Sequence, residues 1–202
     1  MRSAVYIALV GCFFATHYVF VYGAGPCAEP YLTALPPFFF ATCVLSLWQL
    51  LLRDPGHPPL ATEGCGIQSA CARCRRVRVD DATHHCSTCQ QCVVGFDHHC
   101  DVLDACIGRE NLAMFRALLC YHTLLLVYSV HVHWSLLALR SHCFHDLRGF
   151  ALLLVFELSF AFALAVFSTF HAVLWACGGT TYGVLRWWTA RKRAARRAMR
   201  GD

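Results

Sequence analysis

Four long apolar stretches surround one short polar region of the chain. They run from about Ser3 to Tyr22, Leu35 to Leu52, Leu112 to Leu139 and Gly149 to Ala176. A helix of ~20 residues crosses the ~30 Å hydrocarbon core of a bilayer. In lipid, backbone hydrogen bonds must close within each segment, which favours helices. The pattern therefore predicts four transmembrane helices.

The first stretch also has features of a secretory signal peptide, because Arg2 precedes an apolar run. Its apolar core is long for such a peptide. The sequence Tyr22-Gly-Ala-Gly-Pro-Cys27 is only a weak cleavage site. A retained helix is the preferred interpretation.

Composition and charge agree with a membrane protein. Of 202 residues, 57% are hydrophobic and 14% are charged, against about 25% charged in soluble domains. Of 17 Lys and Arg residues, only Arg140 and Arg148 fall between the last two stretches, and none falls between Tyr22 and Leu52. The positive-inside rule then predicts that both termini and the polar region are cytosolic.

The basic tail allows two interpretations. Trp187 and Trp188 precede a run rich in Arg and Ala, which is a good helix former. The tail is either a helix on anionic lipid or an unstructured segment that only sets topology. Nucleic-acid binding is not predicted, because positive-inside topology already explains the charge.

Ionisable residues also occur at or near membrane depth, among them Glu157, His122 and His171. Such residues often mark function in membrane proteins. No polar periodicity runs through several helices, so no transport pathway and no site are predicted from them.

The polar region is crowded with potential metal ligands. Eight of the 14 cysteines lie between Cys65 and Cys106, together with two histidine pairs. Zinc sites commonly combine Cys with His, whereas disulfides do not need His neighbours. Two zinc ions need eight ligands, but this region has eight cysteines and four histidines. Spacing alone leaves open which four are spare.

The pattern within this region is similar to that of the DHHC cysteine-rich protein S-acyltransferases, the palmitoyltransferases. The similarity covers nearly the whole chain. It rests on Asp97-His98-His99-Cys100, Cys71-x2-Cys74, His85-Cys86-x2-Cys89-x2-Cys92, Cys106-Ile-Gly108, Asn111-x3-Phe115 and Asp54-Pro55-Gly56.

The resemblance implies an all-α membrane protein with four transmembrane helices and a small cytosolic zinc-binding domain between the second and third. The implied segments are 1–52 and 112–178 for the helix pairs, 53–111 for the zinc domain and 179–202 for the tail. It also implies two closed structural zinc sites. One takes Cys71, Cys74, His85 and Cys92, and the other takes Cys86, Cys89, His99 and Cys106.

The resemblance further implies that Cys100 is the nucleophile, with His98 and Asp97 as its activating partners. The donor would be an acyl-CoA such as palmitoyl-CoA, and the acceptors would be proteins with cysteines near the bilayer. The endoplasmic reticulum or the Golgi is the implied location. His84 and Cys65 are left as loop residues.

Some positions depart from the family pattern. Asp101 stands where Pro is usual, so a negative charge follows the proposed nucleophile. Gly183 replaces the acid of the Thr-Thr-x-Glu motif, and one residue is inserted between Cys74 and His85. A catalytically weak or silent membrane zinc protein that binds partners is therefore the alternative. The complete Asp-His-His-Cys sequence favours the enzyme.

A basic cluster allows a further hypothesis. Phosphate groups of CoA could bind Arg73, Arg75, Arg76, Arg78 and Arg109. A solvated basic face that sets topology is slightly preferred.

Overall fold

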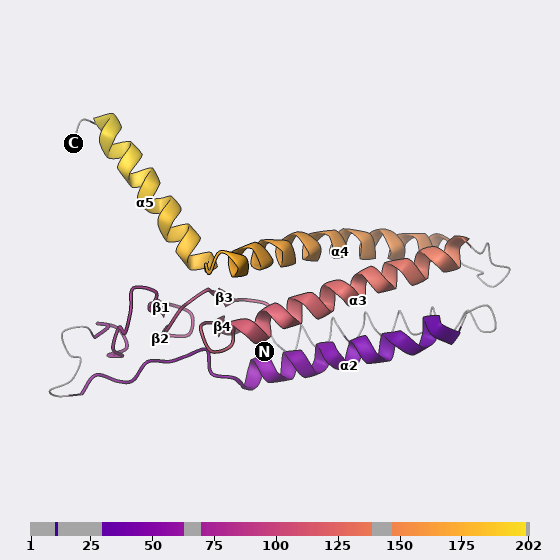
Figure 1. Ribbon diagram of the computed structural model, residues 1–202, viewed down its shortest axis with the longest axis horizontal. Coiled ribbons are helices and arrows are strands. Elements are labelled where there is room, and N and C mark those ends of the chain that lie inside the picture. Colours follow the sequence, from indigo (N-terminus) through magenta and orange to yellow (C-terminus); the bar gives the residue numbers. More distant parts are fainter. Residues whose placement is uncertain (1–10, 12–29, 63–69, 139–146, 201–202) are drawn as a thin grey trace. The chain divides into compact units, whose positions relative to one another are not determined.

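The computed structural model describes residues 11, 30–62, 70–138 and 147–200. They form the helices α2 (Pro30–Leu52), α3 (Leu112–Ala138), α4 (Leu147–Ala176) and α5 (Thr181–Arg200). Four short strands lie between α2 and α3, namely β1 (His84–Cys86), β2 (Gln91–Val93), β3 (His98–Cys100) and β4 (Ala105–Ile107) (Figure 1). The predicted first helix, Ser3–Tyr22, lies outside the described residues.

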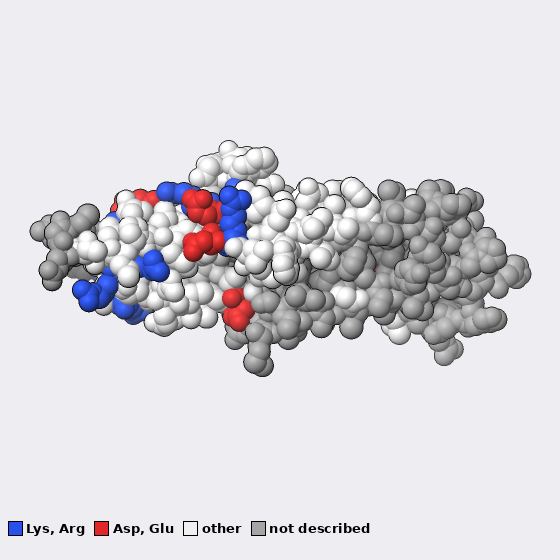
Figure 2. Space-filling model, turned by 90° about the horizontal axis from the view of Figure 1, so that it is seen from below, with Lys and Arg blue, Asp and Glu red and all other residues white. Residues whose placement is uncertain are grey.

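The chain divides into two compact units. One comprises residues 1–50 and 114–171, and the other comprises 51–113 and 172–202. The first is the helical unit, and the second is the cysteine-rich unit. Figure 2 shows that Lys and Arg side chains (blue) lie near Asp and Glu side chains (red) on the visible face. The other described residues on this face are uncharged (white).

Within the described residues, two helices are long and apolar enough to cross a membrane. Their apolar windows are Leu112–Ser135 in α3 and Leu154–Ala176 in α4. The described apolar part of α2 is shorter, Ala41–Leu52. The mostly helical, membrane-capable architecture is thus confirmed, whereas four spans stay a prediction.

Polar side chains connect α3 and α4 inside the helical unit. Glu157 accepts hydrogen bonds from Ser129 Oγ at 3.0 Å and from His133 Nδ1 at 2.7 Å. Both Glu157 and His133 are fully buried. Thr123 and Ser168 form a further hydrogen bond of 2.7 Å. Lipid offers no polar partners, so membrane helices satisfy such groups across their interfaces.

The cysteine-rich unit contains two small antiparallel hairpins, β1–β2 and β3–β4. The all-α prediction missed them, because each strand has only three residues. One buried cluster around them consists of Cys86, Val93, Phe96 and Cys106. Domains as small as this one usually need a metal or disulfides for stability.

The basic tail forms α5, and none of the side chains of this helix is buried. The helical interpretation of the tail is therefore correct over Thr181–Arg200. The contact of this helix with lipid stays a prediction.

Candidate active site and metal centres

The two hairpins are copies of one another, 14 residues apart. His84-His85-Cys86 begins the first and His98-His99-Cys100 begins the second. Antiparallel pairing places His85 opposite Cys92 and His99 opposite Cys106. Each hairpin therefore presents one imidazole and one thiol from directly facing positions.

The turns of the hairpins share a backbone feature. Each turn has four residues, and its last residue is left-handed: Gln90 has φ 57° and Asp104 has φ 54°. Arg75, which follows Cys74, has φ 57° as well. This conformation reverses the chain tightly, which allows the two cysteines of a Cys-x2-Cys pair to point at a common centre.

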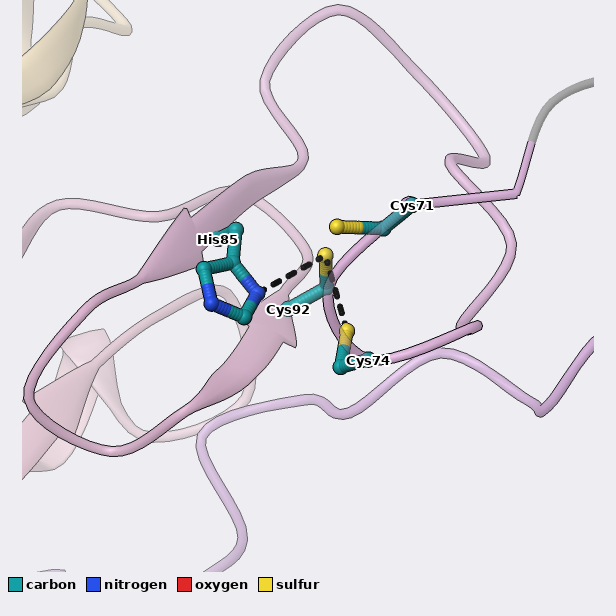
Figure 3. A group of neighbouring side chains, drawn as sticks. All are labelled: Cys71, Cys74, His85 and Cys92. Carbon is teal, nitrogen blue, oxygen red and sulfur yellow. Dashed lines mark hydrogen bonds between the residues drawn. The ribbon is translucent and has the colours of Figure 1, made fainter.

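The first group of converging side chains is Cys71, Cys74, His85 and Cys92, whose ligand atoms all lie within 4.8 Å of one another. Figure 3 shows the three thiols and the imidazole directed at a common point. Cys92 Sγ lies 3.5 Å from Cys74 Sγ and 4.0 Å from His85 Nδ1. The knuckle Cys71–Cys74 thus meets the facing pair His85–Cys92.

The second group is Cys86, Cys89, His99 and Cys106, again within 4.8 Å. Cys89 Sγ lies 3.4 Å from His99 Nδ1 and 3.2 Å from Cys106 Sγ. Here the knuckle comes from the turn of the first hairpin, and the facing pair comes from the second. The structure thus brings together the same two sets of four residues that the family resemblance implies.

Both groups fit a tetrahedral zinc ion by their donor chemistry. With Zn–S bonds of 2.3 Å, the sulfur atoms of a tetrahedral site lie about 3.8 Å apart. Burial, and then the neighbouring sulfur atoms of Cys74 and Cys71, raises the pKa of Cys92 to about 12. Burial and the thiols of Cys89 and Cys86 likewise raise the pKa of Cys106. A divalent cation offsets this cost, because it favours the thiolate.

Among the cysteines of the two hairpins, Cys100 alone belongs to neither metal group. It occupies the position in the second hairpin that Cys86 occupies in the first. Cys86 has a knuckle partner three residues later in Cys89, whereas the residue three after Cys100 is Leu103. Leu103 is buried, and its side chain offers no ligand. The half-buried thiol of Cys100 is left outside both metal groups.

A hydrogen-bonded chain leads from Asp97 to Cys100. Asp97 Oδ2 lies 2.7 Å from His98 Nδ1, and His98 is also hydrogen-bonded to Cys100. Burial lowers the pKa of His98, but the hydrogen bonds to Asp97 and Cys100 raise it, to about 9. The buried carboxylate thus orients the imidazole and favours its protonated form.

Asp97 is itself held from two sides. Its backbone N–H donates to Ile107 O at 2.9 Å, and its Oδ1 accepts the backbone N–H of Thr181 at 3.0 Å. Burial raises the pKa of Asp97, but the hydrogen bonds from His98 and Thr181 outweigh this and lower it. Thr181 belongs to the divergent Thr-Thr-x-Gly segment, and this contact 84 residues away in sequence was not predicted.

His84 was predicted to be a loop residue, and the structure places it in an aromatic cluster. Its ring centre lies 4.4 Å from that of Tyr182 and 4.9 Å from that of Phe96. Tyr182 and Phe96 also meet edge to face. This cluster packs the segment that holds Asp97 against the first hairpin. Cys65 lies outside the described residues.

Asn111, the residue before α3, holds the backbone beside the second metal group. Its Oδ1 accepts the backbone N–H of Gly108 at 2.9 Å, and its Nδ2 donates to Cys106 O at 3.0 Å. A Cβ at Gly108 would clash with Pro55 O and with the side chain of Val93. Only glycine therefore fits between this loop and the Asp54-Pro55-Gly56 turn, where Asp54 Oδ1 accepts two backbone N–H groups.

The basic residues considered for CoA differ in their contacts. Arg76 donates to Pro58 O and to Gln91, and Arg109 pairs with Asp80. These two arginines brace the fold. Arg73 and Arg78 are exposed.

A comparison with known families adds to this geometry. A family model described as DHHC palmitoyltransferase matches residues 65–187, which is more than half of the chain. The chain belongs to the DHHC palmitoyltransferase family. The matched range includes both metal groups, Cys100 and the start of α5.

Individual relatives in this family are similar over part of the chain. Palmitoyltransferase ZDHHC15 of Homo sapiens is 38% identical over 71 residues, covering 35% of this chain and 21% of that protein. Palmitoyltransferase PFA3 of Debaryomyces hansenii is 36% identical over 110 residues, covering 52% of this chain and 27% of that protein. The match thus spans about a fifth to a quarter of these relatives' length.

Proposed function

We propose that this protein is a protein S-acyltransferase that moves a fatty acyl group from acyl-CoA to Cys100 and then to cysteines of other proteins. The observation that carries the proposal is the chain Asp97–His98–Cys100, beside two Cys3His groups that exclude Cys100. Family membership supports the same chemistry, because the relatives named above are palmitoyltransferases.

In the first step, the Cys100 thiol passes its proton to His98, and the resulting thiolate attacks the thioester carbonyl of acyl-CoA. The C–S bond to CoA breaks, and protonated His98 gives its proton to the departing CoA sulfur. The new C–S bond leaves an acyl-Cys100. In the second step, His98 takes the proton of a substrate cysteine, whose sulfur attacks the acyl-Cys100 carbonyl. The C–S bond to Cys100 breaks, and the Cys100 sulfur regains a proton from His98.

Asp97 is proposed to position His98 for both steps. Its buried carboxylate fixes the Nδ1 side of the imidazole, so the other ring nitrogen remains for proton exchange with sulfur. Its pKa is lowered from the usual value, which keeps it ionised at neutral pH.

Two zinc ions would be held by the two Cys3His groups. A zinc ion with four protein ligands has no open position for substrate, so its contribution is structural. The proposed ligands His99 and Cys106 belong to β3 and β4, and Cys100 is the last residue of β3. Metal binding at the second site would therefore fix the backbone that carries the nucleophile.

The proposed setting is the membrane–water boundary. The two membrane-capable helices support an integral membrane protein, with the cysteine-rich unit and both termini in the cytosol. We propose four spans, the segment boundaries given above, and residence in the endoplasmic reticulum or Golgi. Protein substrates with cysteines near the bilayer would then reach Cys100 from the cytosolic side.

A second candidate function follows from Asp101. This carboxylate stands next to Cys100, and its side chain is 78% exposed. One oxygen lies 3.9 Å from His99 Nε2. If its charge repels the anionic donor, the protein is a silent relative that binds partners through the cysteine-rich unit.

Acylation of the purified protein separates the two functions. The protein in detergent is mixed with an acyl-CoA that carries a fluorescent acyl chain, and label is followed on a non-reducing gel. The enzyme gives hydroxylamine-sensitive label that C100S lacks. Absence of label in the parent, or equal label in C100S, favours the silent relative. C120S, which replaces an exposed cysteine of α3, is the matched control and keeps the label.

A further inference from the structure

The helix α5 has two opposite faces of different chemistry. At 100° per residue, Arg186, Arg193, Arg197 and Arg200 fall on one face. The opposite face carries Val184, Trp187, Trp188, Ala195 and Met199, with Arg191 between Trp187 and Ala195 and Lys192 at its edge. Every one of these side chains is exposed over the described helix. A soluble surface helix would bury its apolar side against a core.

We propose that α5 is an interfacial helix that binds a bilayer surface containing anionic phospholipid headgroups. The helix carries seven Lys and Arg residues and no acidic residue over Thr181–Arg200. Near an anionic leaflet each basic residue contributes attraction, and the apolar face enters the boundary between headgroups and acyl chains.

The aromatic residues of the apolar face have the chemistry of this boundary. Trp187 is 58% exposed and Trp188 is 49% exposed. Lys192 Nζ lies 3.3 Å from the ring centre of Trp188, and Arg191 lies 4.9 Å from that of Trp187. The two cations on the apolar side of α5, Arg191 and Lys192, therefore lie over indole rings, as expected where Lys and Arg extend from an apolar surface toward headgroups.

The chain also places the start of α5 close to the bilayer. The α4 helix ends at Ala176, and a backbone bond from Gly179 N–H to Leu174 O closes its last turn, with Gly178 left-handed at φ 63°. Four residues then lead to Thr181. They span at most about 14 Å, comparable to the headgroup layers that flank the ~30 Å core. Trp175 at the end of α4 is 71% exposed, as suits an interfacial anchor.

The first turn of α5 is attached to the cysteine-rich unit. Thr181 N–H donates to Asp97, Arg186 donates to Asp81 O, and Tyr182 packs on His84. Beyond Arg186 the described side chains are all exposed. A lipid surface on this exposed part would leave the Asp97 contact in place. The proposal does not depend on acyl transfer.

The test compares hydrogen exchange of the full chain in nanodiscs of phosphatidylcholine alone and of phosphatidylcholine with phosphatidylserine. We expect backbone amides of residues 187–200 to exchange about tenfold more slowly in the anionic discs, because a helix that is bound to lipid opens less often. Two variants separate the two faces. R193Q/R197Q removes charge, and W187S/W188S removes the apolar anchor. R53Q/R73Q, which removes two exposed arginines outside α5, is the matched control.

Both α5 variants are expected to lose the slowing, and the control is expected to keep it. Equal exchange of the parent in the two kinds of disc would overturn the proposal. So would a slowing that survives in R193Q/R197Q. Retention in W187S/W188S alone would contradict insertion of the apolar face. Protection by added RNA or an acidic polypeptide in neutral discs, without protection by phosphatidylserine, would assign α5 to a macromolecular partner instead.

Discussion

Leu103 occupies, in the second hairpin, the position that Cys89 occupies in the first. The two residues are the third after Cys100 and the third after Cys86. Cys86 and Cys89 form a knuckle within the second metal group. Because Leu103 is buried and has no thiol, the same backbone geometry produces no third metal group. The Cys100 thiol thus has no knuckle partner and lies outside both metal groups.

Metal content should differ sharply between variants of Cys86 and Cys100. We expect C86S to bind about one zinc ion per chain, because removing one thiolate opens the second Cys3His group. We expect two zinc ions in both the parent and C100S. Inductively coupled plasma mass spectrometry of the purified proteins measures both. If C100S lost one zinc ion and C86S kept two, the assignment of ligand and nucleophile would be reversed.

Asp97 should set the alkaline limit of activity through His98. The pKa of His98 is raised to about 9, so its protonated form persists below that pH and is lost as the pH rises through it. We expect D97N to move the loss toward the ordinary value of 6.5. The pH profile of autoacylation measures this. If D97N lost autoacylation at the same alkaline pH as the parent, Asp97 would not act through His98.

Asn111 should stabilise the second metal group without taking part in chemistry. N111A leaves the Gly108 N–H and the Cys106 carbonyl without their partner, so we expect a loss of about 2 kcal/mol of unfolding free energy. N111D keeps the acceptor oxygen but buries a carboxylate against the Cys106 carbonyl, so it should lose at least as much. Thermal unfolding in detergent compares these variants with E110A, an exposed neighbour that should change little. Equal stability of N111A and E110A would argue against this role.

The buried pair of Glu157 and His133 should behave as a coupled unit. E157A removes the partner of His133 and Ser129, and we expect it to cost about 3–5 kcal/mol. The double variant H133L/E157L replaces both hydrogen-bonded polar side chains by apolar groups and should recover much of that loss. S159A, an exposed position on α4, is the control. If the double variant lost as much unfolding free energy as the two single substitutions added together, the two side chains would not be coupled.

Asp101 should slow acylation only modestly. Its side chain is 78% exposed, so solvent and salt screen its charge from Cys100. We expect D101N to raise the autoacylation rate about twofold. Rates measured at low and high salt should converge for the parent and D101N. A rise of a hundredfold would mean that this carboxylate holds the enzyme nearly silent.

The helices were predictable from the sequence because their signal is local. The length of an apolar run fixes a membrane-capable helix, and the predicted Leu112–Leu139 and Gly149–Ala176 lie within two residues of α3 and α4 at each end. The start of α2 was placed five residues too late, since its first turns contain Pro30 and Thr33 rather than an unbroken apolar run.

The metal groups were predictable only in part. Spacing indicated zinc chemistry but offered twelve candidates for eight positions, and only the family resemblance separated them. The 14-residue repeat was a further signal, because it sets Leu103 against Cys89. Contacts distant in sequence had no local signal. The bond from Thr181 to Asp97 and the pair of His133 with Glu157 join residues 84 and 24 positions apart.

Identification of the acylated cysteine tests the central claim most directly. The purified protein is incubated with palmitoyl-CoA, digested at neutral pH, and mapped by tandem mass spectrometry. We predict one palmitoyl thioester on the peptide that contains Cys100, removed by hydroxylamine and absent in C100S. A palmitoyl group on another of the 14 cysteines with Cys100 unmodified, or no thioester at all, would contradict the account.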